Sequence, residues 1–381
     1  MHRILFSAAI VIAAETFALT PHAEAQQTKA PAATRTAVQV ETFAKGLENP
    51  WGLQFLPDGR LLVTERPGRL RLVSAKGELS PPIAGVPAVS AVGQGGLLDV
   101  ALAPDFAQSR EIYLTYSEPR EGRTNGTSVA RGKLDVAGNG ARLTDVAVIF
   151  RQRPSYASNN HFGSRIVFTP DGTFFLTVGD RYALRNEAQN PANTIGKVMR
   201  LTRDGNPAPD NPRLPGWDPA IWSIGHRNVQ AAALHPTTGE LWTAEHAARG
   251  GDEINIVRKG RNYGWPVISY GRDYSGAKIG EGTAKAGMEQ PIYYWDPSIA
   301  PSGAAFYAGD LFPQWRGNLL VGALAGQHLS RLVLQGERVI GEERLIENLS
   351  ERIRDVRVGP DGAVWLLTDR AGGTVLRLVP G

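Results

Sequence analysis

The stretch LQFLPDGRLLVTERPGRLRLV (residues 53–73) contains two turn signals between three apolar runs. In Pro57-Asp58-Gly59 the proline presets φ for a turn, and the glycine accepts a positive φ. The flanking runs are rich in residues typical of strands, and long helical periodicity is scarce along the chain. The stretch therefore predicts a strand, a tight turn, a second strand, a further turn and a third strand.

The same unit recurs along the chain, which is the signature of a repeat architecture. Close copies are IVFTPDGTFFLTVGDR (166–181), AALHPTTGELWTAEH (232–246) and VRVGPDGAVWLLTDRAGGTVLRLV (356–379). Looser copies are VALAPDFAQSREIYLTYSE (100–118) and AAFYAGDLFPQWRGNLLVGAL (304–324). Six such units predict an all-β chain folded as a six-bladed β-propeller of four-stranded antiparallel blades, over residues 39–381. A pair of β-sandwiches is the alternative fold.

The N-terminal residues are expected to lie outside this domain. Arg3, an apolar run and Ala23-Glu24-Ala25 form the pattern of a cleaved signal peptide over residues 1–25, with an uncleaved anchor as the alternative. Residues 26–38 are polar and rich in proline and alanine, and they predict a disordered leader. We therefore expect a periplasmic or secreted protein without stable membrane insertion, present as a monomer or a homodimer.

The composition excludes several classes of chemistry. The 381 residues include no cysteine, so thiol catalysis and cysteine-based zinc sites are impossible. The formal net charge is +4, without a Lys/Arg run or aromatic-basic interleaving, so no nucleic acid is expected as a partner. The weak basic balance is compatible with a pocket for a small anionic ligand. No phosphate loop, Gly-x-Ser-x-Gly or dinucleotide-binding motif is present.

Polar residues follow the second strand of several units. In a propeller these strand ends lie on one face near the central channel, where a ligand site would form. The residues in question are Glu65, Asp180, Glu245 and Asp369.

Three further motifs carry residues suited to catalysis or anion binding. His161 lies in a polar turn before a strand and suits a general base, or else caps a neighbouring carbonyl. Arg227 and Asn228 are adjacent polar residues between apolar runs, and Arg227 suits a carboxylate, a carbonyl oxygen or a structural ion pair. Arg352 and Arg354 share one face of a strand, so they form either an anion clamp or a solvated basic face.

The loop ARGGDE after Glu245 offers backbone carbonyls beside Asp252 and Glu253. Carbonyl and carboxylate oxygens together suit Ca²⁺, although a solvated acidic turn has the same composition. We therefore interpret residues 223–266 as one wall of a functional site.

The order of the motifs is more specific than any one of them. In chain order they are GQGGLLDVALAPDF, NNHFGSRIVF, IGKVMRL, GHRNVQ, GGDEINIV, GRNYGWP, DPSIAPSG and RIRDVRVGPDG. Over residues 40–380 the chain resembles the soluble pyrroloquinoline-quinone-dependent sugar dehydrogenases of the glucose/sorbosone dehydrogenase family, in particular the aldose dehydrogenase branch.

This resemblance implies a fold, a cofactor and a reaction. The family fold is a six-bladed propeller, and its quinone cofactor is flat with three carboxylates. His161 would take the proton of the sugar C1 hydroxyl while a hydride passes to the quinone. Arg227 would stabilise charge on the reduced quinone oxygen. The product would be a lactone, and an external acceptor would receive the electrons.

The resemblance also implies the ligands of the cofactor and of two Ca²⁺ ions. The first Ca²⁺ would take the backbone carbonyls of Ala247 and Ala248, and the second would use Glu253 and Tyr263. The cofactor would contact Gln94, Arg227, Asn228, Ala323, Leu324, Ala325, Arg352, Ile353 and Arg354.

The chain departs from the family pattern at three places. Ala247-Ala248 stands where relatives often have Gly-Pro, Ala325 where some have a lysine, and Asn160 where some have an acidic residue before the base. Two other functions remain open from the residues alone. One is a Ca²⁺-dependent propeller lactonase or hydrolase with clustered carboxylates, and the other is a non-catalytic propeller that binds sugars or proteins.

Overall fold

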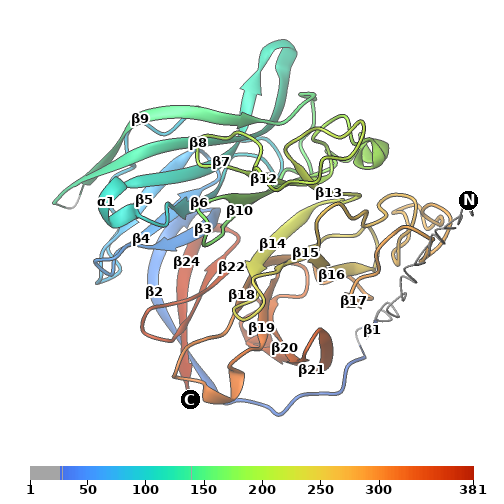
Figure 1. Cartoon of the computed structure of the whole chain (residues 1–381). Helices are drawn as coiled ribbons and strands as arrows, with labels where there is room; N and C mark the ends of the chain where they lie inside the picture. Colours follow the sequence, from blue (N-terminus) through green and yellow to red (C-terminus); the bar gives the residue numbers. More distant parts are fainter. Residues whose placement is uncertain (1–25, 28, 139) are drawn as a thin grey trace, which may run out of the picture.

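The computed structural model describes residues 26–381, apart from residues 28 and 139, and it contains six β-sheets arranged around a central axis (Figure 1). This arrangement confirms the predicted six-bladed propeller and excludes a pair of β-sandwiches. The predicted signal peptide lies outside the described residues. Within the described part of the chain, no helix combines the length and the apolar character needed to cross a membrane.

Each sheet is built mainly from consecutive strands. The first contains β3 (Pro50–Phe55), β4 (Leu61–Glu65) and β5 (Arg69–Val73). The second contains β6 (Leu97–Leu102), β7 (Glu111–Arg120), β8 (Thr124–Ala137) and β9 (Gly140–Arg151), with the short helix α1 (Phe106–Ser109) before β7. The third contains β10 (Gly163–Phe168), β11 (Phe174–Val178), β12 (Lys197–Leu201) and β13 (Ile221–Ile224).

The remaining sheets complete the ring. The fourth contains β14 (Val229–Leu234), β15 (Leu241–Glu245), β16 (Asp252–Val257) and β17 (Tyr293–Trp295), with β1 (Gln26–Gln27) parallel to β17. The fifth contains β18 (Pro301–Phe306), β19 (Leu319–Ala323), β20 (His328–Gln335) and β21 (Arg338–Leu345). The sixth contains β22 (Ile353–Val358), β23 (Val364–Thr368), β24 (Ala371–Pro380) and β2 (Val38–Glu48). The ring closes because β2, from the N-terminal part, pairs antiparallel with β24.

The first sheet has three strands, and an irregular segment takes the place of the fourth. Ser80 N donates to Leu72 O at 2.8 Å, and Ile83 N donates to Leu70 O at 2.8 Å. Pro81 and Pro82 lie between these two residues and have no N–H, so a regular ladder cannot continue here.

Residues 29–37, which belong to the leader predicted over residues 26–38, lie along the edge of β21. Ala33 N donates to Glu342 O at 2.9 Å, and Glu342 N donates to Pro31 O at 3.0 Å. Arg331 Nη2 donates to Thr34 O at 2.9 Å. The segment has no large apolar residue, but its backbone hydrogen bonds to an open sheet edge, which composition does not reveal.

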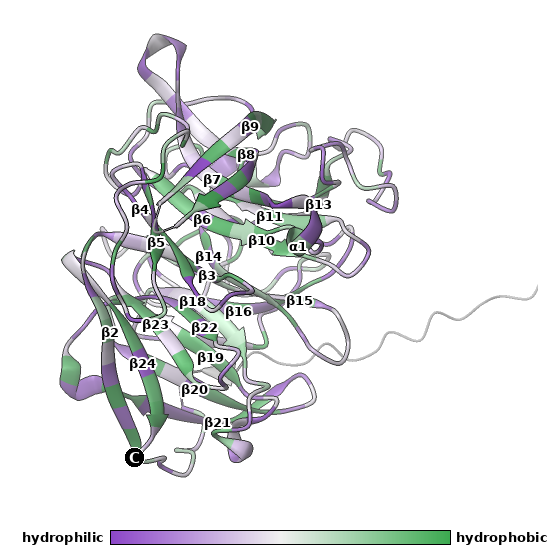
Figure 2. Cartoon of the chain, turned by 90° about the vertical axis from the view of Figure 1, so that its left-hand side faces the viewer, coloured by the Kyte–Doolittle hydropathy of each residue, from purple (hydrophilic) through white to green (hydrophobic). Residues whose placement is uncertain are grey.

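The hydrophobic core lies between neighbouring sheets (Figure 2). Leu53 and Val63 of the first sheet pack with Leu367 of the sixth, for example. Five further clusters join the other neighbouring pairs in the same way. Each blade therefore buries both faces only in the assembled ring.

Arg165 on β10 joins all six sheets at the axis. It is 3% exposed and packs over the Trp51 ring at 4.2 Å. Its guanidinium contacts the other inner strands through Asp99 (3.3 Å), Gln230 O (2.6 Å), Ser302 O (3.2 Å) and Asp355 (2.9 Å). The site described next lies at one end of this axis.

Candidate functional site

The site is built where the start of a first strand meets the end of a second strand. Gly163 of β10 pairs with Val178 of β11 in the antiparallel ladder. His161 precedes Gly163 by two residues and Asp180 follows Val178 by two, so the register brings the two side chains together. The His161 Nδ1 and Asp180 Oδ1 atoms are 2.6 Å apart.

His161 is held in a defined orientation. Its backbone has a φ of 54°, and its N–H donates to Gln94 Oε1 at 2.8 Å. Both Asp180 oxygens accept other N–H donors, so Oδ1 acts as an acceptor toward Nδ1, and we assign the proton to Nδ1 and the lone pair to Nε2. Burial lowers the pKa of His161 below its ordinary value, and Arg227 adds to this, while Asp180 opposes it. His161 is therefore a neutral imidazole at pH 7.

Asp180 is fully buried and accepts two further hydrogen bonds. Tyr182 N donates to Oδ1 at 2.8 Å, and Trp265 Nε1 donates to Oδ2 at 2.7 Å. The sequence places Asp180 on this face, but sequence reasoning missed its pairing with His161. Asp180 supplies the acidic partner that Asn160, next to the base, does not.

The His161–Asp180 pair lines an open cleft of about 270 Å³. Tyr182, Arg227, Trp265 and Tyr274 also line it. Tyr182 and Tyr274 are 50% and 59% exposed. The cleft therefore combines a buried imidazole, a guanidinium and two aromatic rings open to solvent.

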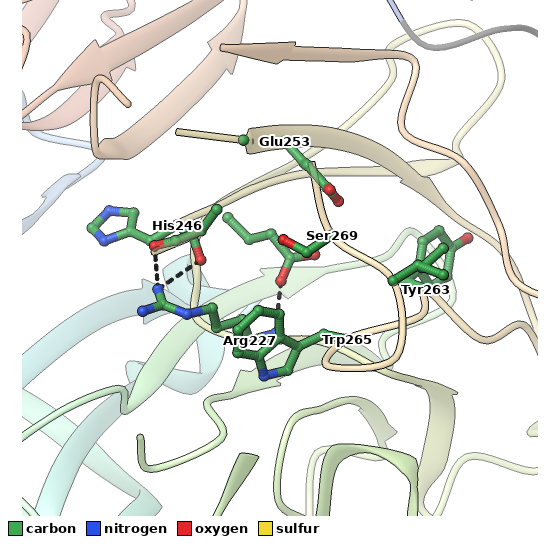
Figure 3. A pocket seen from close by; sticks show the side chains of 10 residues that line it. Arg227, His246, Glu253, Tyr263, Trp265 and Ser269 are labelled. Carbon is green, nitrogen blue, oxygen red and sulfur yellow. Dashed lines mark hydrogen bonds between the residues drawn. The ribbon is translucent and has the colours of Figure 1, made fainter. Parts of the chain in front are cut away.

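Arg227 and Asn228 both face the functional region. The Arg227 guanidinium lies 5.2 Å from the Trp265 ring centre, and its Nη1 donates to His246 O at 2.9 Å and to Ala247 O (Figure 3). Asn228 is 1% exposed, and its Oδ1 accepts Gly163 N at 3.2 Å. Asn228 Nδ2 is buried and has no hydrogen-bond partner among the described residues.

Arg352 and Arg354 share one carboxylate, as their predicted common face requires. Arg354 Nη2 lies 3.0 Å from Asp369 Oδ2, and Arg352 Nη2 lies 3.5 Å from the same atom. Arg354 also donates to Gln230 Oε1 at 3.0 Å, and Gln230 Nε2 donates to Asn228 Oδ1 at 3.1 Å. Gln230 therefore links this basic pair to Asn228.

A second, small cavity of about 20 Å³ lies beside the cleft, with room for one water-sized or ion-sized occupant (Figure 3). Glu245, Glu253 and Tyr263 line it. Burial, and then the nearby carboxylate of Glu245, raise the pKa of Glu253 well above its ordinary value. Two buried carboxylates at one cavity favour a bound cation.

The hydroxyl of Tyr263 is held by two backbone groups. It donates to Ile256 O at 2.5 Å and accepts Arg258 N at 2.7 Å, so it points away from the cavity.

Asp252 braces the loop that carries Ala247 and Ala248. It accepts hydrogen bonds from Ala247 N at 2.8 Å, Ile299 N at 2.8 Å and Ala300 N at 2.7 Å. The carboxylate of Asp252 is therefore used for hydrogen bonds to the backbone. Ala248 lines the cleft, and the carbonyl of Ala247 accepts a hydrogen bond from Arg227.

The other predicted cofactor residues differ in what they present. Ala323 and Ile353 are fully buried and pack in the core between sheets. Leu324 O accepts Arg352 Nη1 at 3.2 Å, and Ala325 is exposed beside it. Gln94 accepts the backbone N–H of His161 through its Oε1.

The carboxylates named in the sequence do not converge on one point. Glu65 pairs with Arg69 at 2.7 Å, Asp180 with His161, and Asp369 with Arg354. Among the described residues, no group of three or more His, Asp or Glu side chains is arranged to hold a metal ion. These separate pairings disfavour the carboxylate ring that a propeller lactonase needs.

The six-bladed propeller and its cleft can now be set beside the comparisons with known proteins. The family model described as Glucose / Sorbosone dehydrogenase matches residues 47–377. Aldose sugar dehydrogenase YliI of Escherichia coli (strain K12) is 46% identical, covering 91% of this chain and 94% of that protein.

Two solved structures share the fold closely. The soluble aldose sugar dehydrogenase from Escherichia coli in the apo-form has a TM-score of 0.87 at 45% identity, covering 90% of this chain and 100% of that one. The PQQ-bound form of aldose sugar dehydrogenase from Streptomyces coelicolor has a TM-score of 0.76 at 30% identity, covering 91% and 99%. The chain belongs to the glucose/sorbosone dehydrogenase family, and it is a sugar-oxidising oxidoreductase.

Proposed function

We propose that the protein oxidises aldoses at C1 to lactones with pyrroloquinoline quinone as cofactor, and passes the electrons to an external acceptor. The observation that carries this proposal is the neutral His161, oriented by Asp180 at 2.6 Å, beside Arg227 in an open cleft. The PQQ-bound state of the related Streptomyces coelicolor enzyme supports the choice of cofactor.

The residues present fit a flat cofactor with three carboxylates. Asn228 Nδ2 and Arg354 Nε are buried donors without partners in the part of the chain that the structure describes, so a ligand oxygen would satisfy them. Arg352 and Arg354 would hold carboxylates, and Arg227 and Asn228 would face the quinone oxygens. Pyrroloquinoline quinone, when bound, supplies the electrophilic carbonyl that takes the hydride from C1.

His161 performs the proton transfer. Its Nε2 lone pair accepts the proton of the C1 hydroxyl as the hydride leaves C1. The O–H and C1–H bonds break, and the C=O bond of the lactone forms. Asp180 holds the tautomer and stabilises the imidazolium that forms. Arg227 offers positive charge to the oxygen that becomes negative.

We also propose two Ca²⁺ sites. The backbone carbonyls of Ala247 and Ala248 would bind one ion beside the cofactor, and Glu253 with the backbone carbonyl of Tyr263 would bind the other. The second assignment is supported by the raised pKa of Glu253 and by the ion-sized cavity. At the first, Arg227 would share the Ala247 carbonyl with the ion, which a carbonyl with two lone pairs allows.

Export to the periplasm or the medium fits this chemistry, since an external acceptor replaces a cytoplasmic nicotinamide pool. Cell fractionation with an antibody to the mature chain tests the location. Retention of the protein in the cytoplasm would contradict it.

Reconstitution tests the function. The protein is purified without metal, supplied with pyrroloquinoline quinone with and without Ca²⁺, and assayed for aldose-dependent reduction of an artificial dye. We expect activity that needs both additions. Failure of the folded protein to bind the quinone with Ca²⁺ present would refute the proposal, and release of acid from added lactones would then identify a hydrolase.

A further inference from the structure

We propose that Arg66 is a third arginine of the site that binds cofactor carboxylates, and that Asp369 is an internal counter-ion that competes with the ligand. This inference rests on the proposed function and deepens it. It assigns a recognition role to one residue and an opposing role to another.

Arg66 lies at the turn after β4, on the face where Asp180 follows β11. Its Nη1 donates to Gly93 O at 2.7 Å, directly before Gln94. Gln94 in turn accepts the backbone N–H of His161. Arg66 therefore reaches the loop that fixes the base, from a different blade than the one that carries Arg352 and Arg354.

The Arg66 side chain is half-buried and only partly satisfied. Its Nε is buried and without a hydrogen-bond partner in the described chain. Burial lowers the pKa of Arg66, and Arg354 and Arg352 lower it further, while Asp369 opposes them. A guanidinium with a spare donor beside two like charges favours binding of an anion.

Backbone hydrogen bonds bring Arg66 close to Asp369, because Arg66 N donates to Asn49 O at 3.1 Å and Asn49 N donates to Arg370 O at 3.0 Å, directly after Asp369. Burial acts to raise the pKa of Asp369, but Arg354, Arg66 and Arg352 outweigh it and hold the pKa below its ordinary value. Three arginines against one carboxylate leave a net charge of +2. The cluster opens to solvent, because the Arg352 side chain is 47% exposed.

Asp369 and a ligand carboxylate would draw on the same donors. Asp369 accepts Arg352 and Arg354 through Oδ2 alone, while its buried Oδ1 finds no partner among the residues described. Replacing Asp369 by the isosteric asparagine raises the net charge of the cluster by one. We therefore expect Asp369→Asn to tighten binding of a polycarboxylate, and Arg66→Gln to weaken it.

The experiment measures binding to the full apo-protein by isothermal titration calorimetry at several salt concentrations. The probes are pyrroloquinoline quinone and pyridine-2,4,6-tricarboxylate, which is redox-inactive. Arg66→Gln should weaken binding of both about tenfold, as expected for one hydrogen bond to a charged group, with a shallower salt dependence. Asp369→Asn should tighten binding at least about threefold.

Arg60→Gln is the matched control, because it makes the same charge change at the opposite end of β4. Arg60 pairs with Asp58 there, and the variant should bind both probes as the wild type does. Arg66→Lys keeps the charge, so its affinity should lie closer to the wild type than that of Arg66→Gln. Thermal melting checks that each variant is folded.

The outcomes separate this inference from the proposed function. Wild-type affinity in folded Arg66→Gln, or equal losses in Arg66→Gln and Arg66→Lys, would overturn the role of Arg66. Weaker binding by Asp369→Asn would overturn the role of Asp369. A wild type that binds the tricarboxylate but not the quinone would keep the cluster and refute the cofactor, and one that binds neither would refute both.

Discussion

Replacing Asp180 by asparagine tests whether this residue sets the tautomer of the base. Asp180 accepts three hydrogen bonds, of which His161 Nδ1 and Tyr182 N share Oδ1 and Trp265 Nε1 uses Oδ2. Asparagine has only one oxygen. If that oxygen faces His161, the amide NH₂ meets the indole N–H, and two donors oppose each other. If the amide is flipped, the NH₂ meets His161 Nδ1 and moves the imidazole proton to Nε2, which blocks the base.

The magnitude follows from the loss of the charged partner. A hydrogen bond to a charged group contributes about 1.5–3 kcal/mol, which corresponds to roughly 10- to 150-fold in rate. In the molecules with the flipped amide, Nε2 carries the proton, so these molecules are inactive and the rate falls further. We expect kcat of Asp180→Asn to fall by at least about 10²-fold, with little change in quinone affinity, because Asp180 does not touch the Arg352–Arg354 pair.

Adding Trp265→Phe to Asp180→Asn tests whether the two opposed donors cause the loss of activity. Phenylalanine removes the indole donor that opposes the unflipped amide, so the oxygen can face His161 again. The double variant should therefore turn over faster than Asp180→Asn alone, whereas Trp265→Phe alone should be slower than the wild type. The assay is dye reduction by protein loaded with quinone and Ca²⁺.

The pH profile provides a second readout with a defined sign. Asp180 acts to raise the pKa of His161, so its loss lowers that pKa further. The base must be neutral to act, so activity is lost as the pH falls through its pKa. The acid limb of kcat/KM should therefore move to lower pH in Asp180→Asn. No rescue by Trp265→Phe, together with an unmoved acid limb, would refute the positioning role.

Further expected outcomes concern the base and the axis. His161→Ala should lower kcat by at least about 10²-fold while equilibrium dialysis shows unchanged quinone binding, and unchanged turnover would remove His161 from the mechanism. In the wild type, the lowered pKa of His161 predicts that kcat/KM persists below pH 6.5, and a midpoint above 6.5 would contradict the assigned environment. Arg165→Met should destabilise the protein by about 3–5 kcal/mol in urea unfolding, since it leaves buried carboxylates short of a partner. Arg357→Met, whose side chain is 25% exposed, should cost less, and equal losses would argue against a special role of Arg165.

The fold was predictable because each repeat contains a turn whose residue types can be recognised in the sequence. Gly59 and Gly362 both adopt the positive φ that the Pro-Asp-Gly turns require, at 86° and 77°. The closure of the ring was not predictable in this way. The pairing of Val38–Glu48 with the last strand depends on residues more than 300 positions apart, and no local pattern encodes it.

The site was predictable in position more than in atomic detail. The motifs indicate His161, Arg227 and Arg354, and the structure places all three on one face. Tyr263 illustrates the limit, because the sequence does not tell whether a hydroxyl or a backbone carbonyl faces a cavity. That choice depends on Ile256 O and Arg258 N, which hold the hydroxyl elsewhere.

The His161–Asp180 pair could have been found from the sequence by counting along the hairpin. In an antiparallel pair, residues equally far outside two paired positions lie opposite each other, provided that the register continues. The TPDG turn fixes which residues pair, and the count then leads from His161 to Asp180. The bulge between Gly163 and Ile166 shifts this count, so the register has to be known before the pair is certain.

The precision of the site follows from its link to the axis of the propeller. Arg354 and Asp355 are consecutive at the start of β22, where a register shift between Ile353 and Asp355 interrupts the regular ladder. Asp355 pairs with Arg165, while Arg354 pairs with Asp369 and donates to Gln230. Arg165 also donates to the carbonyls of Gln230 and Arg354. Arg165 therefore binds the backbone of the same two residues, Arg354 and Gln230, whose side chains lie at the site. A substitution of Arg165 is expected to displace those side chains directly.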